Sequence, residues 1–376
     1  MSANFREHHL FYILNAFEEQ KLPLDVFLRI YLKKHTAIGS HDRKYLSDTI
    51  YKLIRWKGFI DVFCKDNISW ENRVSLLETL SPETYLDDPS IPLHSRVSFP
   101  ENYFSYLTEE LGEIKAKEFC LESNYPAPIT IRANALKISR KELIARLGTK
   151  LPCSEGTESP HSIHFSHRSN FFGLPEFKEG FFEVQDEASQ IVAFQVKASP
   201  GEHVLDYCAG SGGKTLAIAP LLQGKGKLYL HDIRPQILLE AKKRLRRAQI
   251  QNAQFLSHAN PKKKRFYGKM DWVLVDAPCS GSGTLRRSPD MKWNFLKSDL
   301  EDTAQKQREI FEEALAFVKP KGHIVYATCS VLPLENEKQI ELFLKKFPVK
   351  LVGEPFRSFP KKGAMDGFFA ATLQKY

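Results

Sequence analysis

A strand runs into a glycine-rich loop and the start of a helix in Val204-Leu205-Asp206-Tyr207-Cys208-Ala209-Gly210-Ser211-Gly212-Gly213-Lys214-Thr215. An apolar segment with helical periodicity, Leu216 to Leu222, follows directly. Glycine lets the main chain pass close to a ligand, and the amides at the start of a helix attract polar groups. One strand later comes Asp232, where an acid can bond a ribose diol. We therefore expect a nucleoside-containing cofactor on this loop.

The carboxyl-terminal half alternates strands and helices. Apolar runs predict strands at 204–207, 227–230, 253–256, 272–275 and 323–327. This βαβ rhythm predicts an α/β fold with a mostly parallel, doubly wound, Rossmann-like sheet. The last apolar run, Gly367 to Leu373, is expected to be an antiparallel edge strand.

The amino-terminal part has a different sequence pattern, with helical periodicity and no alternation of strands and helices. Apolar residues recur at helical spacing over 5–17 and 24–32, Ser40 is a plausible N-cap of a third helix, and a fourth is expected near 70–80. The stretch 87–92 has the composition of a linker. We predict a helical bundle over 1–90.

Between the bundle and the large sheet we expect a small α+β unit over 97–178. Its predicted elements are strands at 129–134 and 161–165 and a helix at 140–147 capped by Ser139. A strand at 181–184 leads into the third predicted domain, 179–376.

Composition narrows the class of protein. The chain of 376 residues carries a net charge of +9, which favours a polyanionic partner, nucleic acid ahead of an anionic membrane. The six cysteines form no C-x-x-C pair, so neither a zinc site nor a disulfide framework is expected. The amino terminus lacks an apolar signal region, and no run of about 18 apolar residues follows. We expect a soluble, cytoplasmic, monomeric protein that binds no metal.

Three cofactor classes compete for the glycine loop. A phosphate-binding loop fits Gly213-Lys214-Thr215, but Cys208 occupies the position of its leading glycine. A dinucleotide fingerprint fails in its spacing. S-adenosylmethionine carries a ribose and an amino acid but no pyrophosphate, so it needs acids near the strand ends. The sequence supplies three of them, Asp206, Asp232 and Asp276.

Two cysteines follow predicted strands, within Asp276-Ala277-Pro278-Cys279-Ser280-Gly281-Ser282-Gly283 and Tyr326-Ala327-Thr328-Cys329-Ser330. The loops at the carboxyl ends of parallel strands form the ligand crevice of such a sheet. A lone cysteine at a strand end is usually an inert part of the core. Two of them beside a glycine loop favour one pocket with two thiols.

Together these motifs resemble the RsmB/NOL1/NOP2/Sun family of RNA 5-methylcytosine methyltransferases, in particular its bacterial 16S rRNA enzymes. The resemblance covers nearly the whole chain and rests on motifs in the family's order. These are 180–189, 208–215, 276–293, 326–337 and 366–371. The helical first segment is similar, less specifically, to the NusB-like RNA-binding bundle of some members.

The resemblance implies a class I, Rossmann-like methyltransferase sheet that uses S-adenosylmethionine. It implies that Cys329 attacks carbon 6 of a cytosine and that Cys279 helps to release the methylated product. Covalent attack is chemically reasonable because carbon 5 alone is a poor nucleophile. Asp276 is expected at the base's N3 edge or at the amino-acid end of the cofactor. The expected cofactor-binding residues are Cys208, Ala209, Gly210, Ser211, Gly212, Gly213, Lys214, Asp232, His258 and Asp276.

One position departs from the family pattern. Where members carry an acid facing the adenine, this chain has His258. We expect altered contacts with the adenine there rather than lost binding.

RNA is the expected partner, with ribosomal RNA ahead of transfer RNA. Arg286, Arg287 and Lys292 are candidates for phosphate contacts. The basic residues of 241–248 and 262–265 are more simply a solvated helix face and a solvated loop, with phosphate contact as the alternative. Trp293 is either a stacking surface or part of the core. A non-catalytic RNA-binding assembly factor of the same fold is the alternative from another class. A DNA cytosine methyltransferase is disfavoured by Thr328-Cys329, because such enzymes use the proline-cysteine thiol.

Overall fold

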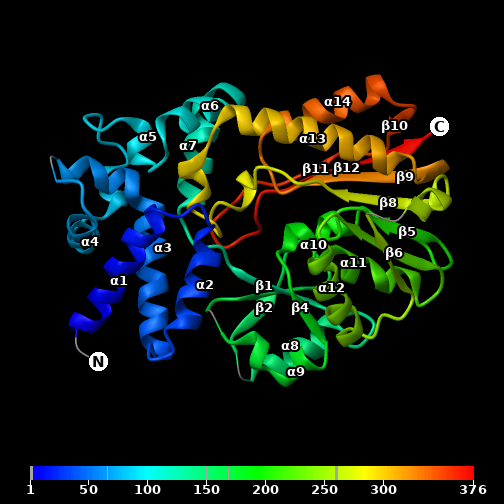
Figure 1. The fold of residues 1–376 in the computed structure, drawn as a ribbon, viewed down its shortest axis with the longest axis horizontal. Coiled ribbons are helices and arrows are strands. Elements are labelled where there is room, and N and C mark those ends of the chain that lie inside the picture. The colour runs from blue at the N-terminus through cyan, green and yellow to red at the C-terminus, as the bar shows by residue number, and fades with distance from the viewer. Residues whose placement is uncertain (1–2, 66, 150, 168, 259–260) are drawn as a thin grey trace. The chain divides into compact units, whose positions relative to one another are not determined.

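The computed structural model describes residues 3–65, 67–149, 151–167, 169–258 and 261–376. The chain forms two compact units (Figure 1). The first consists of residues 1–126 together with 284–297, and the second of 127–283 together with 298–376. The predicted boundary near residue 90 falls inside the first unit. Of the expected α+β unit over 97–178, residues 97–126 belong to the first unit and residues 127–178 to the second.

The first unit is helical. Its helices are α1 (Ala3–Glu18), α2 (Leu24–Lys34), α3 (Ser40–Cys64), α4 (Trp70–Thr79), α5 (Leu93–Arg96), α6 (Glu101–Leu111) and α7 (Glu113–Ser123). The predicted periodicity is confirmed, because α1 and α3 bury residues such as Leu10 and Leu53 in one apolar core. Ser40 is not the N-cap of α3. Gly39 holds that position, and its lack of a side chain leaves the cap without a side-chain bond.

The segment 284–297 packs into this helical core. Lys292 is only 1% exposed, and its Nζ donates to Arg55 O at 2.7 Å and to Asn124 Oδ1 at 2.6 Å. Arg286 is also 1% exposed. The predicted phosphate contacts of these two residues are therefore wrong. Trp293 contributes to the core, and its indole Nε1 donates to Ile54 O.

The second unit contains a small antiparallel sheet with the strand order β2-β3-β1-β4. Its strands are β1 (Ile129–Ala133), β2 (Cys153–Glu155), β3 (Ser162–Phe165) and β4 (Phe182–Val184). Helix α8 (Arg140–Gly148) begins at the predicted N-cap, Ser139, which forms a capping box with Glu142. The short helix α9 (Pro175–Lys178) precedes β4.

The large sheet has the order β10-β12-β9-β8-β5-β6-β7, with β11 paired to β12. Its strands are β5 (His203–Asp206), β6 (Lys227–Asp232), β7 (Ala253–Ser257), β8 (Met270–Asp276), β9 (Val318–Thr328), β10 (Val349–Leu351), β11 (Phe356–Arg357) and β12 (Phe369–Lys375). The five strands from β9 to β7 run parallel, which confirms the predicted α/β sheet. Strand β12 is antiparallel as predicted, but it is not an edge strand, because β10 pairs with its far side.

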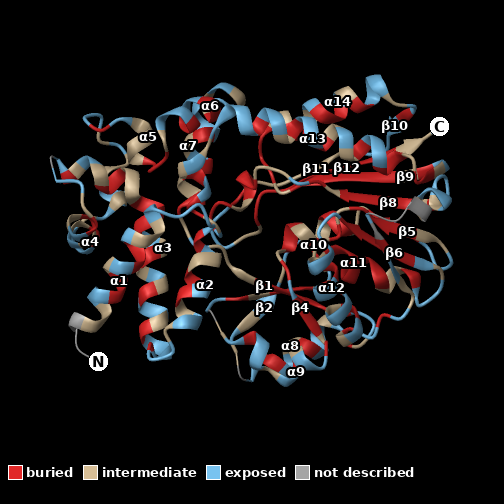
Figure 2. Cartoon of the chain, in the orientation of Figure 1, coloured by how far each residue is buried: buried red, intermediate tan, exposed pale blue. Residues whose placement is uncertain are grey.

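Two apolar cores cover the two faces of the large sheet. One is built with α10 (Glu187–Ala193), α11 (Gly213–Ile218) and α12 (Pro235–Arg247). The other is built with α13 (Lys297–Leu315) and α14 (Glu337–Lys346). Figure 2 shows the strands buried between these helices. In the described part of the chain, no helix is long and apolar enough to cross a membrane.

The sheet changes winding direction between β5 and β8. The chain passes from β5 outward to β6 and β7, and then returns to form β8 on the other side of β5. Ligands of open α/β sheets bind beyond the carboxyl ends of the strands at such a point. The glycine loop follows β5, and the two cysteine loops follow β8 and β9.

Candidate active site

The two predicted cysteines meet at the carboxyl edge of the sheet. Cys279 Sγ and Cys329 Sγ are 3.2 Å apart, although 50 residues separate them in sequence. They meet because β8 and β9 are paired neighbours, with Asp276 opposite Ala327. Both side chains are partly exposed. The predicted meeting of the two thiols is confirmed.

Main-chain contacts continue past the strand ends and fix the two loops. Gly283 N donates to Cys329 O at 2.9 Å, and Gly367 N donates to Gly283 O at 2.9 Å. A Cβ atom added to Gly283 would lie 1.9 Å from Gly367 O, so any side chain here would force the two loops apart. Glycine is required at this crossing because the two backbones touch.

Lys214 lies on α11 and forms an ion pair with Asp276. The two atoms, Nζ and Oδ2, are 2.5 Å apart. Burial lowers the pKa of Lys214, but the charge of Asp276 and its hydrogen bond outweigh burial and raise that pKa above its ordinary value. An ionised Cys329 raises it further. A permanent cation therefore lies close to Cys329.

Asp206 ends β5 behind the glycine loop. Its Oδ2 accepts a hydrogen bond from Thr215 Oγ1 at 2.6 Å. Burial raises the pKa of Asp206 to about 7, against the opposing effect of that bond. Its other oxygen, Oδ1, is buried and has no hydrogen-bond partner among the described residues. Asp206 Oδ1 is therefore a hydrogen-bond acceptor without a partner among the described residues, next to the glycine loop.

The glycine loop has the backbone that a close ligand requires. Gly212 is the N-cap of α11 with φ +78°, a left-handed conformation that favours glycine. Gly210 has φ +51° and open space where a side chain would lie. Ser211 is held by Arg244, whose Nη1 donates to Ser211 Oγ at 2.6 Å. Burial and the nearby acids raise the pKa of Cys208, which lies where the loop begins.

Arg244 and Arg247 of α12 have structural partners. Both form ion pairs with Glu183 of β4, at 3.0 and 2.5 Å. These two arginines are therefore engaged within the second unit and do not belong to the expected solvated helix face. Lys242, Lys243 and Arg246, on the outer side of the same helix, are exposed.

Asp232 lies at the end of β6, as predicted for an acid that meets a ribose. Its Oδ2 accepts from Gly210 N at 2.9 Å, and its Oδ1 accepts from Arg234 N and Nε. Burial raises the pKa of Asp232, but the bonds from Arg234 and Gly210 prevail and lower it. The carboxylate is ionised and already bonded by a guanidinium that is 64% exposed.

His258 follows β7 and is exposed. Its Nδ1 lies 3.3 Å from His231 Nε2, and His231 Nδ1 lies 2.7 Å from Tyr207 O. Burial lowers the pKa of His231. A neutral His231 therefore donates from Nδ1 to the carbonyl and accepts at Nε2. Residues 259 and 260, next to it, lie outside the described residues.

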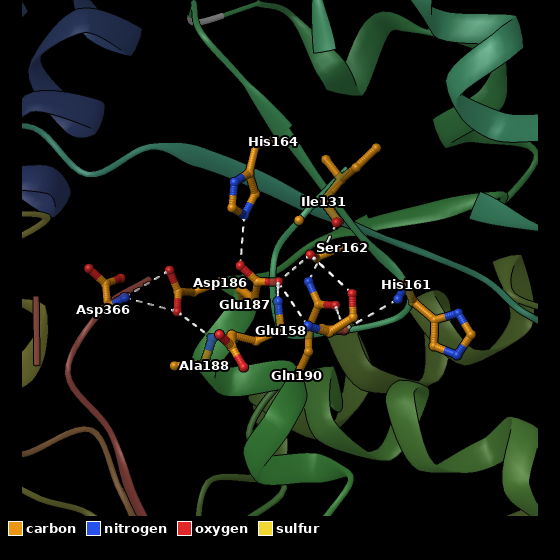
Figure 3. A network of polar contacts seen from close by, with 12 residues as sticks. Ile131, Glu158, His161, Ser162, His164, Asp186, Glu187, Ala188, Gln190 and Asp366 are labelled. Carbon is orange, nitrogen blue, oxygen red and sulfur yellow. Dashed lines mark hydrogen bonds and ion pairs between the residues drawn. The ribbon is translucent and has the colours of Figure 1, made fainter. Parts of the chain in front are cut away.

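A buried polar network joins the small sheet to α10 (Figure 3). Glu187 accepts hydrogen bonds from Ser162 Oγ at 2.6 Å and from Ser159 N at 2.8 Å, and His164 Nε2 lies 2.9 Å from its other oxygen. Burial raises the pKa of Glu187, but these contacts outweigh it and lower the pKa to about 2. The motif 180–189 thus holds the two parts of the second unit together.

Asp186 caps α10 and reaches the carboxyl-terminal motif. Its Oδ1 accepts from Ala188 N at 2.9 Å and from Asp366 N at 3.2 Å (Figure 3). The segment before β12, which ends in Gly367 beside the thiol loops, is therefore anchored to α10. Two sequence motifs that are 180 residues apart support one site.

Sequence reasoning missed Glu335 and Gln307, which are fully buried and bonded to each other behind the Cys279 loop. Glu335 was part of a recognised motif, but no role followed from its residue type. Gln307 left a signal, because it occupies the inward stripe of α13 together with Ala304 and Phe311. A polar residue on an apolar stripe indicates a buried bonded partner.

Comparison with known proteins places these features in one family. The model of the family "16S rRNA methyltransferase RsmB/F" matches residues 193–374. Ribosomal RNA small subunit methyltransferase B of Vibrio vulnificus is 34% identical over 67% of this chain and 61% of its own length. A probable ribosomal RNA small subunit methyltransferase B of Synechocystis is 31% identical over 77% of this chain and 70% of its own. The chain thus spans about three fifths of the length of the Vibrio protein.

The fold also matches a solved structure along nearly its whole length. The crystal structure of PH0851 has a TM-score of 0.81 and 25% sequence identity, covering 97% of both chains. Such a likeness extends beyond the large sheet, because the matched length includes the helical unit and the small sheet.

Proposed function

Because the chain belongs to the RsmB/F family of 16S rRNA methyltransferases, we propose that it methylates carbon 5 of a cytosine in RNA, with S-adenosylmethionine as methyl donor. The observation that carries the proposal is the pair of thiols 3.2 Å apart beside the glycine loop. Small subunit ribosomal RNA is the favoured substrate, because the similar proteins are named for it.

Cys329 is the proposed nucleophile. Its thiolate adds to carbon 6 of the cytosine, and the electron pair of the ring's double bond moves to carbon 5, which becomes nucleophilic. The proximity of the Lys214 ammonium group supports this assignment, since a nearby cation favours a thiolate.

Cys279 acts in the release step of the proposal. After methyl transfer, carbon 5 must lose its proton, and the bond between Cys329 and carbon 6 must then break. The sulfur of Cys279 is close enough to Cys329 to act in both the loss of the proton and the breaking of the bond. Hydrogen bonding to Cys329 and burial raise the pKa of Cys279, so it is a thiol when the base arrives. Once Cys329 is bonded to carbon 6, Cys279 passes its proton to solvent and, as a thiolate, takes the proton of carbon 5. The electron pair left at carbon 5 restores the double bond of the ring and expels Cys329 as a thiolate.

Asp276 is proposed to contact the base. Its side chain is 32% exposed at the end of β8, three residues before Cys279, while Lys214 holds its Oδ2. The free edge of the carboxylate can accept a hydrogen bond from the cytosine amino group. The ion pair fixes the orientation of Asp276 without removing it from the pocket.

The residues present fit S-adenosylmethionine. Asp206 Oδ1, which has no partner among the described residues, suits the amino group of the cofactor. The open space at Gly210 suits a ligand packed against the loop, and Asp232 suits the ribose diol. Loop residues 208–214 and His258 complete the proposed binding set. When bound, S-adenosylmethionine supplies an electrophilic methyl group. Lys214 is engaged by Asp276, which disfavours a nucleotide phosphate in its place.

The test is methylation of small subunit ribosomal RNA by purified protein with methyl-labelled S-adenosylmethionine, followed by nucleoside analysis. Label in 5-methylcytidine is expected, and Cys329→Ala should abolish it. Cys153→Ala, a partly exposed cysteine of the small sheet, is the matched control and should keep activity. Label only in transfer RNA would overturn the ribosomal substrate. Absence of both label and cofactor binding would favour an assembly factor instead.

A further inference from the structure

The loop that carries Cys279 is fixed on both sides by one buried pair, Glu335 and Gln307. Gln307 Nε2 donates to Pro278 O and to Glu335 Oε1, both at 3.0 Å. Glu335 accepts from Ser280 N at 2.8 Å and from Ser280 Oγ at 2.6 Å. The residues before and after the cysteine therefore depend on the same support.

Glu335 bonds as an anion. All three groups that face its two oxygens are donors, so no carboxyl proton is needed to satisfy them. Its position is further fixed by Tyr326, whose hydroxyl donates to Glu335 O at 2.7 Å. Within the described residues, no lysine, arginine or histidine forms an ion pair with Glu335. A buried negative charge without an ion-pair partner among the described residues thus lies close to the loop of Cys279.

The charges around the two thiols are unequal. Lys214, held by Asp276, is the cation that responds to the charge of Cys329. Glu335 lies next to the Cys279 loop. The hydrogen bond with Cys329 and burial raise the pKa of Cys279, and the charge of Glu335 raises it further. Tyr326 is buried close to both Glu335 and Cys279, with Arg308 nearby. Two sulfurs at 3.2 Å cannot both ionise readily, because like charges repel.

We propose that Glu335 is a positioning residue that keeps the shared proton of the thiol pair on Cys279, so that Cys329 is the thiol that ionises. The same carboxylate holds the loop through Ser280, which sets the direction of the Cys279 side chain. Glu335 is not a catalytic residue, since it acts through Cys279 and Ser280. The inference rests on the proposed function for the roles of the two thiols, but its central claim concerns their protonation.

The experiment follows alkylation of Cys279 by iodoacetamide as a function of pH, read by peptide mass spectrometry. It is done in the Cys329→Ala background, where the effect of Glu335 is not masked by the second thiol. Adding Glu335→Gln should move the alkylation curve of Cys279 to lower pH and raise its rate at neutral pH about ten-fold. The matched control is Glu337→Gln, since Glu337 is paired with Arg357 at 2.6 Å and should leave the curve unchanged.

Superimposable alkylation curves for the Cys329→Ala protein and for the doubly substituted Cys329→Ala, Glu335→Gln protein would overturn the proposal. Should the double variant fail to fold, the Cys329→Ala protein can still overturn the proposal. Its Cys279 must then ionise above the range of an ordinary thiol, and ionisation within or below that range overturns the proposal. Alkylation needs neither RNA nor S-adenosylmethionine. A protein without methylation activity would therefore sink the proposed function and leave this result standing.

Discussion

Lys214 and Asp276 form an ion pair of 2.5 Å at the edge of the sheet, between the glycine loop and the two cysteine loops. The pair joins the part of the site that suits a cofactor to the part that holds the thiols. Because Lys214 is buried and Asp276 is one-third exposed, the lysine is a fixed buried charge, and part of the aspartate side chain stays accessible.

Replacing the cation should damage catalysis more than binding. Lys214→Met is expected to lower kcat about 100-fold, since the charge that favours the Cys329 thiolate and orients Asp276 is lost. Cofactor affinity, measured by calorimetry, should change much less. Lys225→Met, in an exposed segment after the same helix, serves as the control. An unchanged kcat would show that the ion pair is only structural.

Removing the second thiol should trap the protein on its RNA. In Cys279→Ala the adduct with Cys329 forms but breaks down about 100-fold more slowly, because the group that serves release is absent. A slowly migrating RNA–protein band on a denaturing gel measures this. The band should vanish in the Cys279→Ala, Cys329→Ala double variant. Normal turnover of Cys279→Ala would contradict the division of roles.

Asp206 predicts a specific dependence of stability on pH. Its pKa is raised in the folded protein from 3.8 to about 7, so the folded state holds the proton more tightly. The stability that this provides is complete below the ordinary pKa and is lost as pH rises through about 7. Relative to Asp206→Asn, the free energy of unfolding of the wild-type protein should therefore fall by a few kcal/mol as pH rises from the ordinary pKa of Asp206 to about 7. The expected slope is about 1.4 kcal/mol per pH unit.

Urea denaturation of both proteins across this pH range measures the difference, and groups that titrate alike in both cancel. The Asn variant should be the more stable one at mildly alkaline pH. Parallel stability curves would mean that Asp206 is ionised throughout.

Arg234 should compete with the ribose for Asp232. Its guanidinium is largely exposed and bonds both carboxylate oxygens, so it has to yield for a diol to bind. Solvent around the exposed guanidinium weakens its pair with the buried Asp232, and Arg234→Ala should tighten S-adenosylmethionine binding by up to about five-fold. Calorimetric titration tests this, with Arg246→Ala on the exposed side of α12 as control. Weaker binding in Arg234→Ala would mean that the arginine itself contacts the cofactor.

The large sheet and the meeting of the two thiols were predictable from sequence. Apolar runs followed by glycine, proline and cysteine mark strand ends, and parallel strands bring their ends to one edge. The capping box of α8 was equally local, because Ser139 and Glu142 are three residues apart. The place of β12 in the sheet could not be predicted, because nothing in the sequence of Phe369–Lys375 indicates that β10 pairs with its outer side.

The errors share one physical cause. Lys292 and Arg244 looked like surface charges because charge usually lies in water. Both have partners that are distant in sequence, Asn124 for the lysine and Glu183 for the arginine. Pairing over such distances depends on the tertiary fold, and the one-dimensional pattern carries no mark of it. Glu335 and Gln307 escaped notice for the same reason.

The segment 284–297 determines when the helical unit can complete its packing during synthesis. Asn124 is bonded by the ammonium group of Lys292, and the main chain at Ile54 is bonded by the indole of Trp293. On the ribosome these two donors emerge only after the glycine loop and the Cys279 loop have been made. The amino-terminal helices therefore leave the exit tunnel first but complete their packing late, and a chain that stops before residue 284 would leave them unfinished.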